Sequence, residues 1–445
     1  MKVLLVEKFL QEGGKSGGTT RVVFEIAKVL QKNGHQVIPF TAWNDEVKEK
    51  SPDWVEKHKD YFVTYEDFSS FGFNLGTLRK AVKMIYNYEA ARKIEELIKK
   101  EKPDLAYLHN IFHHIGPAIL PVLKKYNIPV IHTLHHYKHL SANYYLLKDG
   151  RPWEKDKGGK YWRYLTDRVI KGSVLAGFHE MIEMTIHHKL WRPFQRYVNL
   201  CTSPSKFLMQ KSRDYSFPKA IAHLPYGLDE NDYQPGYEPK NYMLFYGRLS
   251  SEKGVQTIID ALARIKGLNT PLYIVGQGEF ESELRQQVQK QRLADKVKFL
   301  GFKTGAELHR LVREAKFVIV PSLWYENSPL TIYESLALGT PVVGAYQGGI
   351  PELIQEDTDL AKSTGVTFAS GDAEDLADKI EFLLAHPELL PAMGQNARRY
   401  FEDNFTLDKY YERFLRLLDV LPVRVGEREP HYPQKLEPVE NKSLT

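Results

Sequence analysis

Short apolar runs alternate with segments of helical periodicity along most of this 445-residue chain, and that alternation limits the fold more than any other feature. In the second half the predicted strands are Tyr242–Tyr246, Leu272–Val275, Val297–Leu300, Phe317–Val320 and Pro341–Val343. The predicted helices between them are Val255–Ile265, Phe280–Arg292, Ala306–Ala315 and Leu330–Leu338. Short, buried-type strands that alternate with helices indicate βαβ units and a parallel sheet covered on both faces.

The first half shows the same alternation less regularly. Its predicted strands are Lys2–Val6, Gln36–Phe40, Leu105–His109, Pro129–Thr133 and Val198–Thr202, and its predicted helices are Thr19–Lys32 and Lys80–Lys100. The sequence therefore predicts the α/β class, with two Rossmann-like domains that face each other across a cleft. Ligands of open α/β sheets bind outside the carboxyl ends of the strands, so the cleft is the expected site.

The length also favours two domains, because single domains average about 150 residues. We expect an N-terminal domain of residues 1–218 and a C-terminal domain of residues 219–395. Leu407–Val420 has the pattern of a terminal helix. Beyond Pro422 the chain is rich in proline and charge without periodicity, and residues 426–445 are predicted to form a mobile tail.

The net charge is modest, 61 − 56 = +5, but it is unevenly distributed. Residues 1–218 contain 35 Lys and Arg against 23 Asp and Glu, or +12, whereas the remainder contains 26 against 33, or −7. The basic half is expected to meet an anionic partner. No helix-turn-helix, zinc-finger or other recognition signature accompanies the charge, which argues against nucleic acid.

Cysteine usage and hydropathy favour a cytoplasmic protein. Cys201 is the single cysteine, so neither an internal disulfide nor a cysteine metal cluster can form. No stretch reaches the ~18 apolar residues of a membrane-spanning helix. The opening apolar run ends at Glu7, which is too short for a secretory signal.

The glycine-rich residues 13–18 follow the first predicted strand and precede a helix. They do not fit the P-loop pattern, because Phe9 stands where that pattern requires glycine, and their spacing differs from the dinucleotide fingerprint. Such glycines still let backbone N–H groups approach an anion at a helix N-terminus. A flexible turn between strand and helix is the alternative interpretation.

Arg248 and Lys253 follow the first predicted strand of the second domain, just before a helix. A guanidinium and an ammonium at this strand end can grip a diphosphate, and both are charged at neutral pH. Two solvated surface cations are the alternative interpretation.

Glu326 and Glu334 lie on either side of the start of a predicted helix that Pro329 could open. Two carboxylates in these positions can accept hydrogen bonds from sugar hydroxyls at two separate points. The N-terminal amides of Leu330 and Thr331 would face a phosphate. The alternative is a helix N-terminus with favourable acidic residues and no ligand.

Seven histidines lie within 31 residues of the first domain: His109, His113, His114, His132, His135, His136 and His139. Imidazole is a common metal ligand, but no His-Glu-x-x-His or similar spacing is present, so no metal site is predicted. His109 and His135 instead end two successive predicted strands, where side chains enter the cleft.

Together these motifs resemble those of the family-4 glycosyltransferases, which are retaining, nucleotide-sugar-dependent enzymes of the GT-B fold. The resemblance spans residues 1 to about 420 and is densest over residues 242–355. It is carried by Gly17-Gly18-x-x-Arg21, Gly247-Arg248-Leu249-x-x-Glu252-Lys253-Gly254, Val275-Gly276-x-Gly278 and the stretch from Glu326-Asn327-Ser328-Pro329-Leu330 through Glu334 to Val343. Polysaccharide biosynthesis is the setting that this resemblance implies.

The resemblance also implies residue roles. Arg248 and Lys253 would hold the donor diphosphate, Glu334 the ribose hydroxyls and Glu326 the donor hexose. His135 would lie beside the reacting carbon, so His135, Arg248, Lys253 and Glu326 are the implied catalytic residues. Further donor contacts would come from Gly17, Gly18, Asn327, Ser328, Leu330 and Thr331, and acceptor contacts are expected from His109 and Tyr137.

Other implications concern the chain's course and its departures from the family pattern. The terminal segment 396–425 would cross back to pack on the N-terminal domain. Asn-Ser-Pro follows Glu326 in place of the commoner Gly-Phe-Gly, which leaves the donor hexose open. Residues 134–155 resemble a branch that usually carries cysteines there, and this chain has none, so no metal or disulfide role of that branch transfers.

The implied reaction is transfer of a hexose from a nucleotide diphosphate sugar to a glycan, lipid-linked or small-molecule acceptor, with retention at the anomeric carbon. No strong nucleophilic dyad is evident, which favours a front-face route in which the leaving phosphate takes the acceptor proton. No metal or other cofactor is expected. The alternatives are an epimerase or phosphorylase of the same fold, and a non-catalytic protein that binds nucleotide sugars.

Residues 138–171 are basic and aromatic, with nine Lys and Arg against four Asp and Glu. A solvated, loosely packed insertion is one interpretation, because charge runs usually mean only that. The other is a surface that draws the protein to an anionic membrane or a phosphate-bearing acceptor.

Overall fold

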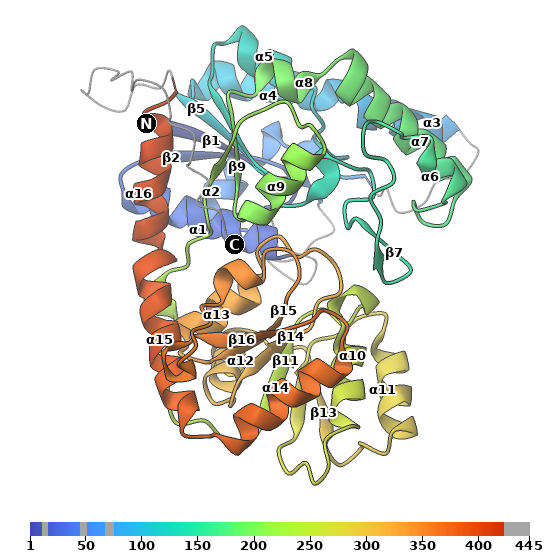
Figure 1. Ribbon diagram of the computed structural model, residues 1–445. Coiled ribbons are helices and arrows are strands. Elements are labelled where there is room, and N and C mark those ends of the chain that lie inside the picture. Colours follow the sequence, from blue (N-terminus) through green and yellow to red (C-terminus); the bar gives the residue numbers. More distant parts are fainter. Residues whose placement is uncertain (11–16, 45–50, 67–74, 422–445) are drawn as a thin grey trace.

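The computed structural model describes residues 1–10, 17–44, 51–66 and 75–421. Its architecture is two six-stranded sheets, one above the other in Figure 1, each flanked by helices. Every strand pair within the two large sheets is parallel. Residues 13–16 of the predicted glycine-rich segment and the predicted tail (426–445) lie outside the described residues.

The first sheet has the strand order β10-β9-β6-β5-β1-β2. Its strands are β1 (Lys2–Val6), β2 (Gln36–Phe40), β5 (Leu105–Leu108), β6 (Val130–Thr133), β9 (Leu200–Ser203) and β10 (Ile221–His223). Strand β1 lies between the edge strand β2 and β5, with Val3 paired to Val37 on one side and to Leu105 on the other. Val3, Leu4, Leu5 and Val6 are fully buried, as expected for a strand covered on both faces.

The second sheet has the order β13-β12-β11-β14-β15-β16. Its strands are β11 (Met243–Tyr246), β12 (Leu272–Val275), β13 (Val297–Gly301), β14 (Val318–Val320), β15 (Val342–Ala345) and β16 (Gly365–Phe368). In both sheets the first strand lies inside the sheet, and later strands are added on both sides of it. Ligands of such folds bind at the switch point where the direction of winding changes. Strands β10 and β16 were not predicted.

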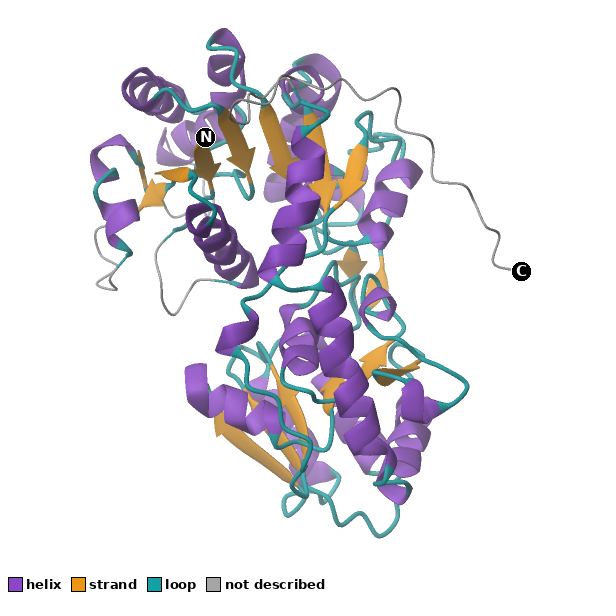
Figure 2. Ribbon diagram, turned by 90° about the vertical axis from the view of Figure 1, so that its left-hand side faces the viewer, coloured by secondary structure: helices purple, strands orange, loops and turns teal. Residues whose placement is uncertain are grey.

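Helices cover both sheets (Figure 2). Around the first are α1 (Gly18–Lys32), α3 (Leu75–Ile85), α4 (Tyr88–Glu101), α5 (Ile119–Lys125), α7 (Val174–Thr185), α8 (Pro193–Tyr197) and α9 (Lys206–Asp214). Around the second are α10 (Val255–Leu262), α11 (Glu281–Lys290), α12 (Gly305–Arg313), α13 (Leu330–Ala337), α14 (Ala373–Ala385) and α15 (Leu389–Asn404).

The single helix predicted over residues 80–100 is wrong, because the chain breaks between α3 and α4. The Asn87 side chain accepts a hydrogen bond from the Ala90 amide and so caps α4. Asparagine is a strong N-cap residue, and its competition with the backbone ends the preceding helix.

The predicted junction after residue 218 falls before the last strand of the first sheet. Strand β10 pairs with β9 through Ile221 and Cys201, so the first sheet continues to His223. A three-residue edge strand of mixed polarity gives little periodic signal, which explains the early boundary.

Helix α16 (Leu407–Leu418) returns to the first sheet after α15 has packed on α13. The Tyr410 and Tyr107 hydroxyls are hydrogen-bonded at 2.7 Å, and the Phe414 ring stacks on the Tyr107 ring. Figure 1 shows α16 beside α1 along one side of the molecule. The contact with the first sheet thus begins in α16 and not at residue 396.

Residues 138–171 are not loosely packed. They form the two-stranded hairpin β7 (Leu147–Lys148) and β8 (Arg151–Pro152), and then α6 (Arg163–Thr166). Trp153, Tyr161 and Tyr164 are buried and form a small separate core with Ala142 and Met184. Within the described residues, no helix is long and apolar enough to cross a membrane.

Candidate active site between the two sheets

A cavity of about 740 Å³ lies where the carboxyl ends of the two sheets meet. The first sheet's side contributes His135, which follows β6, and Gly17 and Gly18, which begin α1. The second sheet's side contributes the loops after β11, β12 and β14. The predicted donor residues that line the cavity are Gly17, Gly18, Arg248, Lys253, Glu326, Asn327, Ser328, Leu330 and Thr331.

Close backbone packing at the ends of β11 and β12 forms the floor of this cavity. A Cβ atom added to Gly276 would lie 1.8 Å from the Gly247 carbonyl oxygen, and one added to Gly278 would lie 2.2 Å from the Leu249 oxygen. Neither position therefore accepts a side chain, and the glycines of the Val275-Gly276-x-Gly278 motif are steric requirements.

Arg248 and Lys253 extend into the cavity from the segment between β11 and α10, and each contacts a carboxylate. The Arg248 guanidinium pairs with Glu252 and donates to the Tyr145 hydroxyl at 3.3 Å. These partners raise the pKa of Arg248, which is charged at every working pH. The Lys253 ammonium donates to Glu326 Oε1 at 2.6 Å.

Glu326 is buried in the loop before α13 and joins two elements of the site. Its Oε1 also accepts from the Ser322 hydroxyl at 3.0 Å. Lys253 in addition lies over the Trp324 ring, 5.5 Å from its centroid. The carboxylate that is predicted to bind the donor hexose is therefore held at a fixed distance from the cation that is predicted to bind the diphosphate.

The N-termini of α1 and α13 meet at the cavity. Gly18 and Leu330 lie close together, since a Cβ added at Gly18 would lie 3.4 Å from Leu330 Cδ1. Helix N-termini carry partial positive charge and unpaired amide hydrogens. Two such ends, together with Arg248 and Lys253, make this part of the cavity favourable for a diphosphate.

Asn327 connects the two halves of the site, and Ser328 is bonded within the second half. The Asn327 amide donates to the backbone carbonyls of Leu134 and His135, both at 3.0 Å, and its Oδ1 accepts from Ser205. The Ser328 hydroxyl is hydrogen-bonded to the Tyr333 hydroxyl at 2.7 Å. Asn327 thereby fixes the loop that carries His135.

Glu334 lies in the second turn of α13, and its side chain is only 6% exposed. It does not line the cavity but forms an ion pair with Arg21, which comes from α1 across the junction. Thr331, one turn earlier, accepts a hydrogen bond from the Tyr246 hydroxyl at 2.7 Å through its carbonyl.

His135 is part of a buried hydrogen-bonded row. Its Nδ1 lies 2.6 Å from the Tyr226 hydroxyl, and its Nε2 lies 2.9 Å from His109 Nδ1. Burial lowers the pKa of His135 to about 3 and that of His109 well below its usual value. Both rings are therefore uncharged at neutral pH, and both nitrogens of His135 have partners.

The two residues predicted to contact the acceptor do not line the cavity. His109 is buried behind His135, and Tyr137 is fully buried against Tyr325. Each ends or follows a strand of a sheet that is covered on both faces, so a strand-end position alone could not tell cavity from core.

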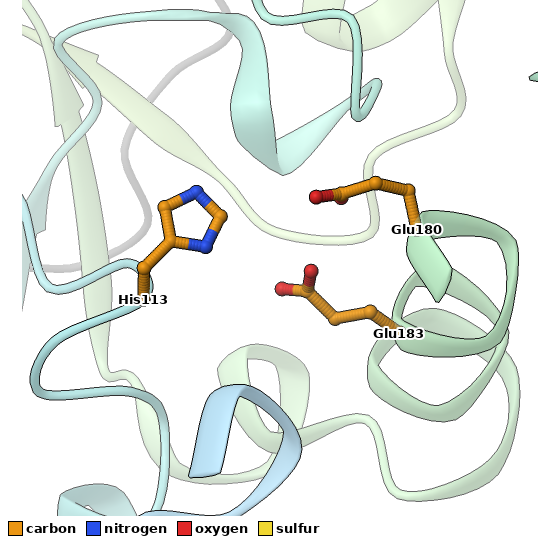
Figure 3. Close-up of side chains that lie close together, drawn as sticks. All are labelled: His113, Glu180 and Glu183. Atoms are coloured by element: carbon orange, nitrogen blue, oxygen red, sulfur yellow. The ribbon is translucent and has the colours of Figure 1, made fainter. Parts of the chain in front are cut away.

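His113 is the one member of the histidine cluster that joins carboxylates in a metal-like group among the described residues. It faces Glu180 and Glu183 of α7 (Figure 3), and one ligand atom of each lies within 4.8 Å of the others. The Lys138 ammonium, however, bonds both carboxylates. An ammonium of the chain thus already pairs with both carboxylates, and the expectation of no metal stays a prediction.

Sequence reasoning did not assign Tyr226 or Trp324 to the site, and it placed Tyr145 only among the aromatic residues of the basic segment 138–171. Tyr226 and Trp324 line the cavity, and Tyr145, just before the β7–β8 hairpin, accepts a hydrogen bond from Arg248. Only the aromatic content of their segments could have suggested them.

Two family profiles match consecutive parts of the chain. The profile of Glycosyltransferase Family 4 matches residues 16–232, and that of Glycosyl transferases group 1 matches residues 230–400. The O-antigen chain mannosyltransferase C of Escherichia coli is 27% identical over 274 residues, which cover 58% of this chain and 71% of that protein. The alpha-D-kanosaminyltransferase of Streptomyces kanamyceticus is 28% identical over 189 residues, 42% of this chain and 45% of that protein.

Solved structures show the same fold. HepE from Anabaena in complex with UDP superposes with a TM-score of 0.63 at 18% identity, covering 95% of this chain and all of that one. The sucrose-phosphate synthase of Thermosynechococcus elongatus gives a TM-score of 0.66 at 17% identity, covering 94% of this chain and 98% of that one.

Proposed function

This chain belongs to the family-4 glycosyltransferases of the GT-B fold, and from that premise we propose that it transfers a hexose from a nucleotide diphosphate sugar, with retention, to a glycan or lipid-linked acceptor. The observation that carries the proposal is the convergence of Arg248, Lys253 and Glu326 with two helix N-termini around one cavity. The UDP complex of HepE and the mannosyltransferase among the relatives agree with such a donor.

The diphosphate would lie between the cations and the helix ends. Lys253 has three N–H donors and spends one on Glu326, so it can also bind a phosphate oxygen. As the bond to the hexose breaks, negative charge grows on the diphosphate, and fixed donors that face this charge stabilise the transition state. The leaving phosphate oxygen, on the same face of the sugar, would then accept the proton of the attacking hydroxyl.

His135 would support this reaction without exchanging a proton. Its nitrogens are bonded to Tyr226 and His109, and burial keeps the ring neutral. A neutral ring beside the anomeric carbon adds no positive charge that would oppose the oxocarbenium character of the sugar. Its proposed role is therefore to shape the wall of the cavity.

A donor screen followed by product analysis tests the proposal. The protein is heated with a panel of UDP-, GDP- and ADP-sugars, since a ligand that binds only the folded state raises the melting temperature. The stabilising donor is then incubated with glycan acceptors, and the anomeric configuration of the product is read by NMR. Inversion would refute retention, and transfer by a Lys253→Ala variant at the wild-type rate would refute the diphosphate site.

The same assay separates the alternatives left open by the sequence. An epimerase converts the donor to a second nucleotide sugar without an acceptor, and a phosphorylase needs inorganic phosphate. A binding protein is stabilised by the donor but turns nothing over. Slow donor hydrolysis that is accelerated by an acceptor supports the glycosyltransferase.

We also propose that the enzyme works at an anionic membrane, which suits a lipid-linked acceptor. Residues 154–196 contain nine Lys and Arg against five acids, 9 − 5 = +4. Each of the five acids has a hydrogen-bond or ion-pair partner within the protein: Glu154 has Lys211, Asp156 has Tyr164, Asp167 has Trp153, and Glu180 and Glu183 share Lys138. Glu154 also pairs with Lys157, and Asp167 with Lys155 and Arg163, so the positive charge at the surface of this segment comes chiefly from its other basic residues.

Large apolar side chains are exposed on the same segment: Trp162, Val174, Phe178 and Leu190. Basic residues near an anionic bilayer contribute about 1 kcal/mol each, and interfacial aromatics add to binding. Co-sedimentation with phosphatidylglycerol vesicles, but not phosphatidylcholine vesicles, is expected at low salt. A Trp162→Ser/Phe178→Ser variant should lose it, whereas Phe302→Ser/Tyr346→Ser, exposed residues of the second half, should retain it. Equal binding to both vesicle types would refute the proposal.

A further inference from the structure

Arg21 is a cation of the first half that contacts the carboxylate predicted to bind the donor ribose. Its Nη1 pairs with Glu334 Oε1, and its Nη2 donates to the Tyr233 hydroxyl at 2.5 Å. The Tyr233 ring is fully buried and stacks on His309. Arg21 and Glu334 are separated by 313 residues and belong to helices α1 and α13, which pack on different sheets.

The position of Arg21 is unfavourable for its own helix. It lies in the first turn of α1, where the helix dipole disfavours a cation and favours an acid. The first turn of α1 indeed contains no acidic residue. A guanidinium placed against the dipole is explained by its contacts across the junction and not by helix stability.

Helix α1 therefore contributes to the nucleotide site in two ways, one direct and one through Glu334. Its first residues, Gly18 and Thr19, line the cavity at the phosphate end, and Arg21, about one turn later, holds Glu334. A carboxylate has about four acceptor positions, so Glu334 can keep Arg21 on Oε1 and still accept from ribose hydroxyls. The planar fork of Arg21, fixed on its other side by Tyr233, leaves the carboxylate few orientations.

We infer that Arg21 is a positioning residue for ribose recognition: it orients Glu334 from the opposite half of the molecule, so that the nucleotide site is complete only when the two halves are together. This inference rests on the proposed function, in which Glu334 binds the ribose. It makes donor binding depend on closure of the two halves although Arg21 itself touches no part of the cavity.

The alternative is that Arg21 competes with the ribose for Glu334. Both interpretations rest on the same contact, but they predict opposite changes in ribose binding when Arg21 is removed. A positioning residue strengthens ribose binding, so its removal weakens the binding. A competitor weakens ribose binding, so its removal strengthens it.

The test measures Kd by calorimetry for UDP and GDP and for their 2′-deoxy counterparts. In the wild type the ribonucleotide should bind more tightly than the deoxynucleotide, because Glu334 accepts from the 2′-hydroxyl. Arg21→Gln should weaken ribonucleotide binding about tenfold, the scale of one charge-assisted hydrogen bond. It should leave deoxynucleotide binding nearly unchanged, so the ribose preference falls toward one. Equal weakening of ribonucleotide and deoxynucleotide binding would indicate a general loss of folding and would overturn the inference.

Three further variants complete the test. Glu334→Gln should abolish the ribose preference, and Arg21→Gln should then add nothing to it. Arg21→Lys should restore only part of the preference, because an ammonium cannot bond Glu334 and Tyr233 with one plane. Lys28→Gln is the matched control, since Lys28 lies two turns further along α1 and pairs with Asp229 and Asp232 across the same junction. It should retain the full preference.

The outcomes distinguish an error in the proposed ribose site from an error in the proposed role of Arg21. If Glu334→Gln leaves the ribose preference intact, the proposed ribose site is wrong. If Glu334→Gln removes it and Arg21→Gln does not, the ribose site stands and the role of Arg21 is refuted. Tighter ribonucleotide binding by Arg21→Gln would identify a competitor and would also refute it.

Discussion

Glu7 is expected to be an uncharged carboxyl at neutral pH, and its titration should be visible in the stability of the protein. It follows β1 at the carboxyl end of the first sheet and is fully buried. Its Oε2 accepts from the Asn110 amide at 2.9 Å, and Oε1 has no hydrogen-bond partner among the described residues. Burial raises its pKa from 4.5 to about 8.

The sign of the effect follows from linkage. Between pH 4.5 and about 8 the folded state holds a proton that the unfolded state has released. Glu7 therefore contributes its full stabilisation of the folded state below the pKa that it has in the unfolded chain. This contribution is lost as the pH rises through the pKa that it has in the folded protein. At about 1.4 kcal/mol per pH unit, the loss between about pH 5.5 and 8 amounts to roughly 3 kcal/mol.

The assay is urea unfolding of the wild type and of Glu7→Gln at intervals across this pH range. Glutamine has the shape of the protonated acid and does not titrate, while buried histidines titrate in both proteins and cancel in the difference. The wild type should lose about 3 kcal/mol relative to the variant as the pH rises. A difference that stays constant with pH would show that Glu7 is charged in the folded protein and would refute the reasoning.

Three further predictions concern catalysis. Glu334→Ala should raise the KM for the donor more than it lowers kcat, because ribose contacts are alike in ground and transition states, whereas Glu326→Ala should lower kcat; steady-state kinetics with the identified donor distinguish the two. Arg248→Ala and Lys253→Ala should each lower kcat by roughly two to three orders of magnitude, and unchanged turnover in either would mean that the diphosphate lies elsewhere. Activity should survive EDTA, since these cations take the place of a divalent ion; loss that added metal reverses would contradict this.

The strands that carry the site could be predicted because they are short, continuous apolar runs. Residues just after such runs, among them Arg248, Lys253 and Glu326, were correctly expected at one edge because the carboxyl ends of parallel strands meet there. The same rule failed for His109 and Tyr137. In a sheet covered on both faces a strand-end side chain can enter the core as readily as the cleft, and no periodicity distinguishes the two.

Contacts between distant segments were beyond sequence reasoning. The bond between Tyr226 and His135 and the pair of Arg21 and Glu334 join residues whose patterns carry no sign of each other. The partners of the acids in residues 154–196 could not be predicted for the same reason, since a count of charges does not show which side chains are buried or paired. The break at Asn87 is different, because it depends on a local signal. An N-cap residue between two helical patterns could have been recognised in the sequence as the end of one helix and the start of the next.

Two cations of the chain, Lys253 and Arg21, are each paired with a carboxylate from another element. Lys253 holds Glu326, and Arg21 holds Glu334. Pairing of this kind lowers the affinity for a free anion, because part of the positive charge is already used. It also fixes the side chains before the donor binds, so that binding loses little further side-chain conformational entropy. Arg248 is paired as well, with Glu252, so the two helix N-termini supply positive charge that substitution of a single cation does not remove. Loss of Lys253 should therefore affect turnover more than donor binding, because the transition state, with its extra charge on the diphosphate, needs the additional cation and the ground state does not.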